Sequence, residues 1–271
     1  MSDFEKIKKY YNEFDEKNRL SRDSSGKLEY DMTKKILEKY LQKESTILDL
    51  GGGAGVYTMM LAEKNHKMYL ADLSEKLINE AKQVVHEKSL KNVISCDVVN
   101  AIDLSKYQDE MFDAIILFGP LYHLTNSEER KKCVQEITRV LKKDGLVFAS
   151  FIPYLSGSIA IVDRYFRHPE QVNSNNLIKV FETGIFNSNS DTGFQEGYYP
   201  SAQEVIKLFE KDFEKIEVRS IRGFGYEREE QIYNIQNKEM YENIINMIEK
   251  TARQKEIVET CGHAMYIGKK K

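Results

Sequence analysis

The chain has 271 residues, of which 41% are hydrophobic and 31% charged, and its formal net charge is −3. This length suits one large domain or a domain with an insertion or cap. The charge gives no overall field that would favour nucleic acid, no apolar run is long enough to span a membrane, and residues 1–6 hold no apolar signal core, which predicts a cytoplasmic protein.

Cysteine usage predicts neither disulfides nor a metal site. Cys96, Cys133 and Cys261 lie far apart in the sequence, and no two of them form a C-x-x-C pair. Such scattered thiols are typical of a reduced protein without a disulfide framework. We therefore expect no bound metal ion.

Two amphipathic helices are predicted before the first strand, over residues 3–20 and 28–42, with a loop over 21–26. Apolar residues recur at helical spacing in both segments. Because these helices precede the first strand, they must pack outside the sheet, where residues 1–44 can cover a ligand cleft as a helical lid. Tyr11 belongs to an aromatic cluster of the first helix and suits either this lid or the core.

The most informative stretch follows at residues 46–56. A short apolar run that contains Asp49 leads into three glycines spaced two residues apart, Gly51, Gly53 and Gly55, and a helix is predicted to begin directly after them. Glycine serves where the backbone needs a positive φ or must approach a ligand closely. A helix N-terminus offers N–H groups and a partial positive charge. The stretch predicts a cofactor cradle, and a glycine-rich turn without a ligand is the alternative.

The spacing of these glycines argues against two common cofactor motifs. A dinucleotide fingerprint, G-x-G-x-x-G, would place its third glycine at Val56 or Thr58, depending on the register. A phosphate-binding loop would need a lysine directly after Gly55, and none is there. An NAD-dependent enzyme is therefore disfavoured, and the remaining pattern is acid-x-Gly-x-Gly-x-Gly.

Strands and helices alternate as far as residue 151. Ser74 is a predicted N-cap, and Gly145 is predicted just past the end of a helix over 127–143. The alternation indicates an α/β fold with a doubly wound, mostly parallel, seven-stranded Rossmann-like sheet. Its strands are predicted at residues 46–50, 66–71, 93–96, 112–118, 146–151, 215–221 and 263–268.

The alternation breaks after residue 151. We divide the chain into the N-terminal lid, a core over 45–151, a cap or substrate insertion over 152–200, and the remainder of the core over 201–271. Ser201 and Glu204 form a predicted capping box at the start of this last part, which carries an inserted helical segment over 227–258. Additions at the ends of sheet strands are where substrate pockets tend to be built.

Three acids stand at the carboxyl ends of the first three predicted strands. These are Asp49, Asp72 and Asp97, and in a parallel sheet such ends face the ligand crevice. Asp72 lies 21 residues after Gly51, close to the ~20 expected for an acid that binds ribose hydroxyls. Asp97 could accept a hydrogen bond from an adenine amine. A single such Asp is more often a turn or cap residue, but all three after this glycine loop favour a ligand site.

Residues 45–151 thus resemble the core of the class I, Rossmann-like S-adenosylmethionine (SAM) methyltransferases. The resemblance implies that the three glycines contact the methionine part of SAM and that Asp49 orients the loop or the ammonium group. It further implies a ribose and adenine contact by Asp72 with Leu73, an adenine contact by Asp97 with Val98, and a wall near the sulfonium formed by Leu117 with Phe118. The weaker candidates for the cofactor site are Tyr30, from a stretch that precedes the core in small-molecule members, and Tyr11.

A second motif follows the fourth predicted strand, at residues 118–124. Its Gly119-Pro120 resembles a subset of bacterial small-molecule methyltransferases and departs from the N-P-P-[YF] pattern of methylases that act on amino groups of nucleic-acid bases or protein glutamine. His123 is a candidate general base and Tyr122 a candidate pocket residue. A histidine that only hydrogen-bonds the lid is the alternative for His123.

The predicted function is therefore SAM-dependent transfer of a methyl group to an N, O or S atom of a small molecule. We expect a monomer or homodimer, no membrane association and no nucleic-acid partner. Two alternatives stay open, which are a non-catalytic module that binds SAM or a nucleoside, and an RNA methyltransferase.

Overall fold

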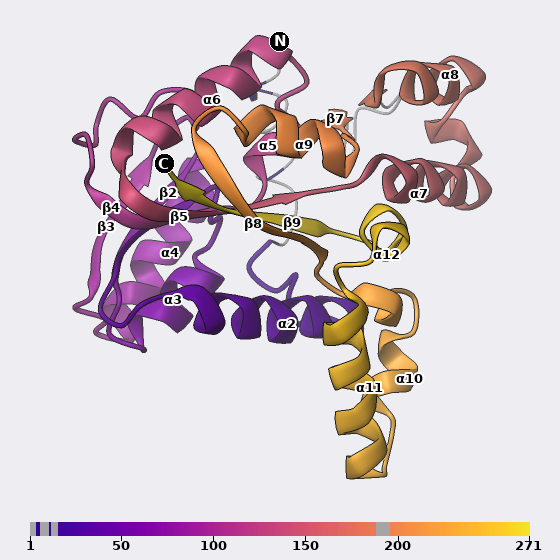
Figure 1. Ribbon diagram of the computed structural model, residues 1–271, viewed down its shortest axis with the longest axis horizontal. Helices are drawn as coiled ribbons and strands as arrows, with labels where there is room; N and C mark the ends of the chain where they lie inside the picture. Colours follow the sequence, from indigo (N-terminus) through magenta and orange to yellow (C-terminus); the bar gives the residue numbers. More distant parts are fainter. Residues whose placement is uncertain (1–3, 6–10, 12–15, 188–195) are drawn as a thin grey trace.

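A single seven-stranded sheet organises the chain (Figure 1). The computed structural model describes residues 4–5, 11, 16–187 and 196–271. The strand order is β3-β2-β1-β4-β5-β9-β8, and β9 runs antiparallel to both of its neighbours. The predicted doubly wound, mostly parallel sheet of seven strands is confirmed. The strands are β1 Thr46–Leu50, β2 Lys67–Asp72, β3 Val93–Val98, β4 Phe112–Leu117, β5 Leu141–Phe151, β8 Phe213–Ser220 and β9 Ala264–Lys270.

Helices cover both faces of this sheet (Figure 1). One face is packed by α2 Ser24–Tyr40, α3 Val56–Ala62 and α4 Glu75–Glu87, and the other by α6 Ser127–Val140 and α9 Ala202–Phe209.

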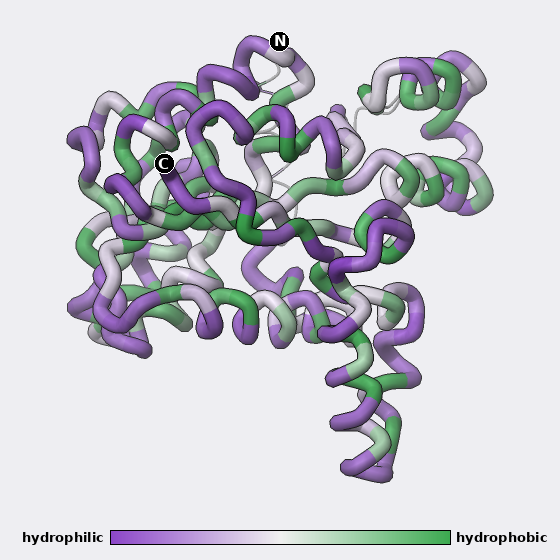
Figure 2. The backbone as a smooth tube through the Cα atoms, viewed as in Figure 1, coloured by the Kyte–Doolittle hydropathy of each residue, from purple (hydrophilic) through white to green (hydrophobic). Residues whose placement is uncertain are grey.

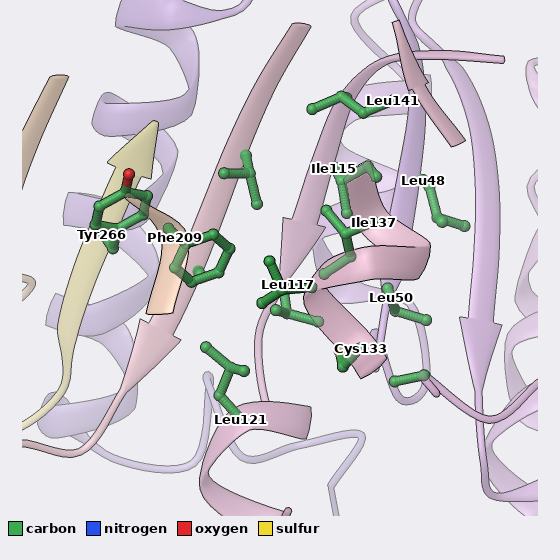
Figure 3. Close-up of a cluster of buried hydrophobic side chains, with 14 of the residues drawn as sticks. Leu48, Leu50, Ile115, Leu117, Leu121, Cys133, Ile137, Leu141, Phe209 and Tyr266 are labelled. Carbon is green, nitrogen blue, oxygen red and sulfur yellow. The ribbon is translucent and has the colours of Figure 1, made fainter. Parts of the chain in front are cut away.

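The central strand β4 is apolar from Ala114 to Leu117 because this part serves both faces. Ile115 and Leu117 point into the cluster under α6 and α9, which Figure 3 shows, whereas Ala114 and Ile116 pack in the cluster under α2 and α3. Alternate residues of a strand point to opposite faces, so a strand covered on both sides needs apolar residues at every position.

Local capping signals place several helices as predicted. The Ser74 hydroxyl accepts from the Leu77 N–H at the start of α4. Ser201 and Glu204 form the predicted reciprocal capping box at the start of α9. Side-chain caps of this kind satisfy N–H groups that have no partner within the helix, which is why these starts can be predicted from sequence.

Several predicted boundaries are wrong, and two of them have a clear local cause. The helix expected to reach residue 143 ends at Val140, because Leu141 already has extended backbone and pairs with Phe112 in the sheet. Gly145 therefore lies inside β5, and it is Asp144 that adopts a positive φ of 62°. The loop expected over 21–26 is shorter, because Asp23 caps α2 by accepting a hydrogen bond of 2.8 Å from the Gly26 N–H.

The additions to the core are helical. The cap consists of α7 Tyr154–Arg167, η1 Pro169–Gln171, α8 Ser174–Thr183 and the hairpin β6 Ile185–Asn187 with β7 Glu196–Tyr198. In Figure 1, α7 and α8 project from one side of the sheet and α11 projects from another. The region over 227–258 is occupied by α10 Glu229–Tyr233, α11 Lys238–Thr251 and α12 Lys255–Thr260, and it follows η2 Gly223–Gly225. The domain boundaries themselves stay predictions.

Most of the predicted first helix lies outside the described residues, as does the polar stretch after Asn187. Residues 17–20, which were expected to continue that helix, form a turn. The three cysteines are unpaired. Within the part of the chain that the structure describes, no helix is long and apolar enough to cross a membrane, and no group of three metal-ligating side chains comes together.

Candidate cofactor and acceptor site

One cavity opens at the carboxyl ends of the parallel strands, the position where ligands bind in open α/β sheets. It is bounded by the loops that follow β1, β2, β3 and β4, by the beginning of α2 and by the residue before β9. Nine of the residues predicted from sequence line it, namely Tyr11, Asp49, Gly51, Gly53, Asp72, Leu73, Phe118, Tyr122 and His123.

The glycine loop forms the floor of the cavity. Gly51 and Gly53 adopt φ values of 78° and 56°. A Cβ atom on Gly51 would lie 2.5 Å from the Pro120 Cδ atom, so the loop at the end of β1 passes too close to the loop after β4 for any side chain. Here glycine is required both by backbone conformation and by close approach.

Asp72 ties this loop to the next helix. Its Oδ2 accepts from the Gly53 N–H at 2.9 Å, and its Oδ1 accepts from the Ser74 N–H at 2.8 Å. Burial raises the pKa of Asp72. Each carboxylate oxygen has a second lone pair, so both can still accept from a pair of ligand hydroxyls in the cavity.

Asp49 presents a buried oxygen without a partner. The Thr58 hydroxyl donates to Oδ2 at 2.7 Å, whereas Oδ1 has no hydrogen-bond partner among the described residues. Burial raises the pKa of Asp49 to about 6. Buried polar atoms are nearly always hydrogen-bonded, and those that are not call for an explanation. A ligand N–H group or a ligand cation would satisfy this oxygen.

The other end of the cavity is built by the turn after β4. Gly119 has a φ of 122°, and Pro120 then starts the short helix α5 Pro120–His123, which the sequence analysis did not predict. The Nε2 atom of His123 lies 2.8 Å from the Tyr11 hydroxyl oxygen. Burial lowers the pKa of His123 to about 4, so this imidazole stays neutral at ordinary pH.

Sequence reasoning missed a charged chain beside this end. Arg19 donates to Glu16 through Nε and to Glu29 through Nη1, each at 2.8 Å. The second Glu29 oxygen lies 2.9 Å from Nδ1 of His263, whose ring stacks on Tyr122. Burial alone would raise the pKa of Glu29, but the charges of His263 and Arg19 hold it well below its usual range. All five of these residues line the cavity.

Asp97 and Val98 do not line the cavity, contrary to expectation. The strand β3 continues to Val98, so Asp97 lies within the strand, and Lys106 Nζ donates to its carboxylate at 2.6 Å. This ion pair holds the pKa of Asp97 below its usual value, although burial acts in the opposite direction. Val98 is 49% exposed. Residues 99–101 line the cavity instead, two positions further along than a strand ending at residue 96 predicted.

Gly55 and Leu117 also lie outside the cavity lining. Gly55 precedes α3 with a φ of 82°, and a Cβ atom there would lie 3.0 Å from the Met59 Cε atom, so this glycine serves the packing of the helix. Leu117 is fully buried in the cluster beside α6, where Figure 3 shows it near Cys133 and Ile137. Phe118, one residue later, turns to the cavity because side chains alternate along a strand.

Tyr30 also lies away from the cavity lining. Its ring stacks on that of Tyr57, with 5.9 Å between the ring centroids. Glu29 and Thr33, which are four residues apart and therefore on one helix face, line the cavity in its place. The segment around Tyr30 thus does reach the cavity, but through Glu29 and Thr33 and not through Tyr30 itself.

Comparisons with known proteins agree with this geometry. A family model described as a methyltransferase domain matches residues 48–149. The tRNA 5-carboxymethoxyuridine methyltransferase of Escherichia coli is 25% identical over 43% of this chain and 44% of its own length. The tRNA (carboxymethyluridine(34)-5-O)-methyltransferase of Arabidopsis thaliana is 33% identical over 40% of this chain and 24% of its own length. The chain thus spans less than half the length of these curated relatives.

The fold has solved counterparts as well. The structure of Burkholderia thailandensis 1,6-didemethyltoxoflavin-N1-methyltransferase, with its substrate and S-adenosylhomocysteine bound, superposes with a TM-score of 0.61. The two chains are 13% identical, and the match covers 99% of this chain and 86% of the other. At this identity the likeness concerns the fold.

Fold and glycine loop define a Rossmann-like α/β domain with a ligand cavity at the carboxyl ends of its strands. Over the matched residues 48–149, fold, glycine loop and family model together indicate a class I SAM-dependent methyltransferase domain, whose cofactor is SAM. The expected absence of a nucleic-acid partner gains no support from the relatives, because the names of the E. coli and Arabidopsis proteins specify tRNA.

Proposed function

We propose that this protein transfers a methyl group from SAM to an N, O or S atom of a small molecule held in the same cavity. The observation that carries the proposal is that one cavity joins the glycine loop and Asp72 to an enclosed end formed by Tyr122, His123 and His263. Transfer by in-line displacement requires the two reactants to meet in such a shared, enclosed space.

The cofactor end has groups suited to SAM. Gly51 and Gly53 line the cavity with bare backbone, which a ligand can approach closely. Asp72 offers two acceptor oxygens for the vicinal ribose hydroxyls, and the unpartnered Asp49 oxygen suits the ammonium group. When bound, SAM supplies a methyl group already activated by a sulfonium.

Two further parts of the lining complete the fit. Arg19 carries five N–H donors, more than its bonds to Glu16 and Glu29 use, and it can therefore hold the methionine carboxylate. Leu73 and residues 99–101 form walls for the adenine. These roles replace the adenine contacts that the sequence suggested for Asp97 and Val98.

The acceptor end favours a small, largely uncharged molecule. Aromatic and imidazole rings enclose it, from Tyr11, Phe118, Tyr122, His123 and His263. Among the described lining residues Arg19 is the one lysine or arginine, and two carboxylates already engage it. Flat rings and polar ring atoms of this kind bind small molecules through apolar contact with a few directed hydrogen bonds.

An RNA acceptor is the alternative that the tRNA-specific relatives raise. RNA binding is driven largely by neutralisation of phosphates and therefore weakens steeply with salt. The net charge of −3 offers no general attraction of this kind. A transfer of label to RNA that falls with added salt would favour the alternative.

The direct test is to incubate the protein with methyl-labelled SAM and either a small-molecule extract or total RNA. We expect label in the small-molecule fraction and none in RNA, with the product detected by mass spectrometry. Calorimetry with SAM alone separates the catalytic proposal from a non-catalytic module, because that module would bind SAM and transfer nothing. Label that appears in RNA alone would contradict the small-molecule proposal.

A further inference from the structure

The acceptor end holds two histidines, and they are not equivalent. We infer that His263, oriented by Glu29, is the base that removes a proton from the acceptor, and that His123 is not. This inference rests on the proposed methyl transfer and adds a residue that the sequence analysis did not single out. Glu29 is then a positioning residue, because it acts through His263.

The carboxylate of Glu29 fixes which nitrogen of His263 carries the hydrogen. The Nδ1 atom lies 2.9 Å from Oε2 of Glu29. An ionised carboxylate can only accept a hydrogen bond, so Nδ1 is the donor and the other ring nitrogen, Nε2, keeps its lone pair. A carboxylate that selects the tautomer and orients the ring is the arrangement that supports histidine bases in enzymes.

Packing fixes the plane of the same ring. The His263 and Tyr122 rings lie nearly parallel, at 17°, with 5.9 Å between their centroids. Both residues line the cavity. The Glu29 carboxylate bonded at Nδ1 and the stacked Tyr122 ring leave the imidazole few orientations. A substrate would therefore meet a base that needs little rearrangement.

The contacts of His123 suit a structural role. Its Nε2 atom is engaged by the Tyr11 hydroxyl, and the two rings meet edge to face with centroids 5.5 Å apart. The side chain is buried, and burial lowers its pKa to about 4.

The proton balance is simple. The N–H or O–H bond of the acceptor breaks and its proton passes to Nε2 of His263. The electron pair of the acceptor atom forms the new bond to the methyl carbon, and the pair of the former carbon–sulfur bond remains on sulfur as a neutral thioether. The imidazolium that results is stabilised by Glu29, which also binds Arg19.

Nuclear magnetic resonance of the histidine ring nitrogens in the complex with S-adenosylhomocysteine tests the assignment directly. We expect His263 as the Nδ1–H tautomer in the wild type, and loss of this single tautomer in a Glu29→Gln variant, whose amide group can either accept or donate a hydrogen bond. A His263 signal in the Nε2–H tautomer would overturn the assignment.

Kinetics with labelled SAM and the small-molecule extract supply the second test. We expect His263→Gln to lower the rate at least ~100-fold, the range of general-base catalysis, with SAM affinity by calorimetry unchanged. His86→Gln on α4 is the matched control and should keep the full rate. A His263→Gln variant with wild-type rate would sink the base assignment alone, whereas a wild-type protein that transfers no label would sink the proposed function.

The second inference concerns a different part of the molecule, the outer face of the cap. Leu155, Ile159, Val162 and Phe166 recur along α7 at spacings of four, three and four residues, and all are exposed. Ile178 and Phe181 are exposed on the neighbouring α8. Phe166 and Phe181 leave 75% and 77% of their surface exposed. Figure 2 shows hydrophobic residues along both helices.

This exposed stripe is not the core of the cap. The cap has its own inner cluster, to which α7 contributes Ile161 and α8 contributes Val180. None of the six stripe residues lines the cofactor cavity. Soluble proteins seldom leave a contiguous apolar patch of this size uncovered, so the stripe calls for an occupant.

We propose that a second copy of this chain covers it. The six residues leave 42–77% of their surface exposed, and a standard interface takes about 800 Å² from each partner. In a two-fold symmetric dimer the same patch of each copy faces its counterpart, so α7 and α8 of both copies would form a four-helix arrangement.

Light scattering coupled to size exclusion tests this proposal. We expect the wild type at twice the monomer mass of 31.6 kDa, and a Phe166→Asp/Phe181→Asp variant at the monomer mass. Met247→Asp on α11, which is 54% exposed in the wild type, is the control and should stay dimeric. A monomeric wild type at the concentration used for magnetic resonance would refute the dimer, and so would a double variant that still dimerises.

Discussion

The two ends of the cavity are built in different ways. Most of the cofactor end comes from consecutive elements, since β1, the glycine loop, α3, β2 and Asp72 follow one another within 27 residues, from 46 to 72. The acceptor end joins Glu29 on α2, Tyr122 on α5 and His263 before β9, which are separated by up to 234 residues. One end is local in sequence and the other is assembled only by the finished fold.

This difference in construction bears on which residues of the cavity can be replaced without loss of the fold. The family model covers residues 48–149, which contain the glycine loop and Asp72 but neither Glu29 nor His263. The glycine loop tolerates little substitution, because its backbone passes close to other atoms. The acceptor end is assembled from segments that are distant in the sequence, so its residues can be replaced to bind a different substrate without disturbing the sheet. The four substitutions below test how strictly the cofactor end is constrained.

Gly51→Val should have the largest effect. A Cβ atom at this position would lie 2.5 Å from the Pro120 Cδ atom, and the φ of 78° strongly disfavours a β-branched residue. We expect a loss of SAM binding beyond calorimetric detection and a lower melting temperature. Gly53→Ala is the milder comparison, because its Cβ atom would meet a flexible side chain, the Cγ atom of Glu16, at 3.2 Å. Equal losses of SAM affinity in the two variants would mean that the close approach of the backbone to Pro120 does not explain the requirement for glycine at residue 51.

Asp49→Asn should change how stability depends on pH. Burial raises the pKa of Asp49 from 3.8 to about 6, so the folded protein binds a proton more tightly than the unfolded chain. Stability then falls as the pH rises from about 4 to about 6, by about 3 kcal/mol, and stays lower above that range. The ligand-free variant should lose this dependence and be more stable at pH 7, as measured by denaturant unfolding.

The control for this pH effect has the opposite sign. The pKa of Asp113 is lowered, because Lys142 and the Thr46 N–H stabilise its ionised form against the effect of burial. Asp113 therefore stabilises the fold above its unfolded pKa and loses that contribution as the pH falls. Asp113→Asn should weaken the fold at pH 7. If Asp49→Asn and Asp113→Asn both stabilised the fold at pH 7, the cause would be the removal of a negative charge in general and not the burial of Asp49.

Asp72→Ala should weaken SAM binding by about 2–3 kcal/mol, or roughly 30- to 150-fold, since hydrogen bonds to a charged acceptor contribute at this level. Asp97→Ala is the matched comparison, because Lys106 and Tyr107 engage that carboxylate away from the cavity. We expect its SAM affinity to stay near the wild-type value. If calorimetry showed that Asp97→Ala weakens SAM binding more than Asp72→Ala does, the adenine contact predicted for Asp97 would be supported.

Most of the fold and the position of the glycine loop could be predicted from the sequence, for a physical reason. Apolar periodicity, caps such as Ser74 and the glycine spacing all act over a few residues, so they can be read locally. A small error at a strand end was nevertheless enough to misplace part of the predicted site. The strand β3 continues two residues further than predicted, so residues 99–101 line the cavity in place of Asp97. Arg19 and Glu29 gave no local signal, because their importance comes from contact with each other and with His263.

Tyr30→Phe should have the smallest effect and decides how α2 reaches the cavity. Tyr30 stacks on Tyr57 but does not itself line the cavity, whereas Glu29 and Thr33 do. Removing the hydroxyl should therefore leave SAM affinity unchanged within the error of calorimetry. A clear loss of affinity would mean that α2 turns on binding and brings Tyr30 to the cofactor. In that case the acceptor end, including Glu29, would be rearranged in the complex as well.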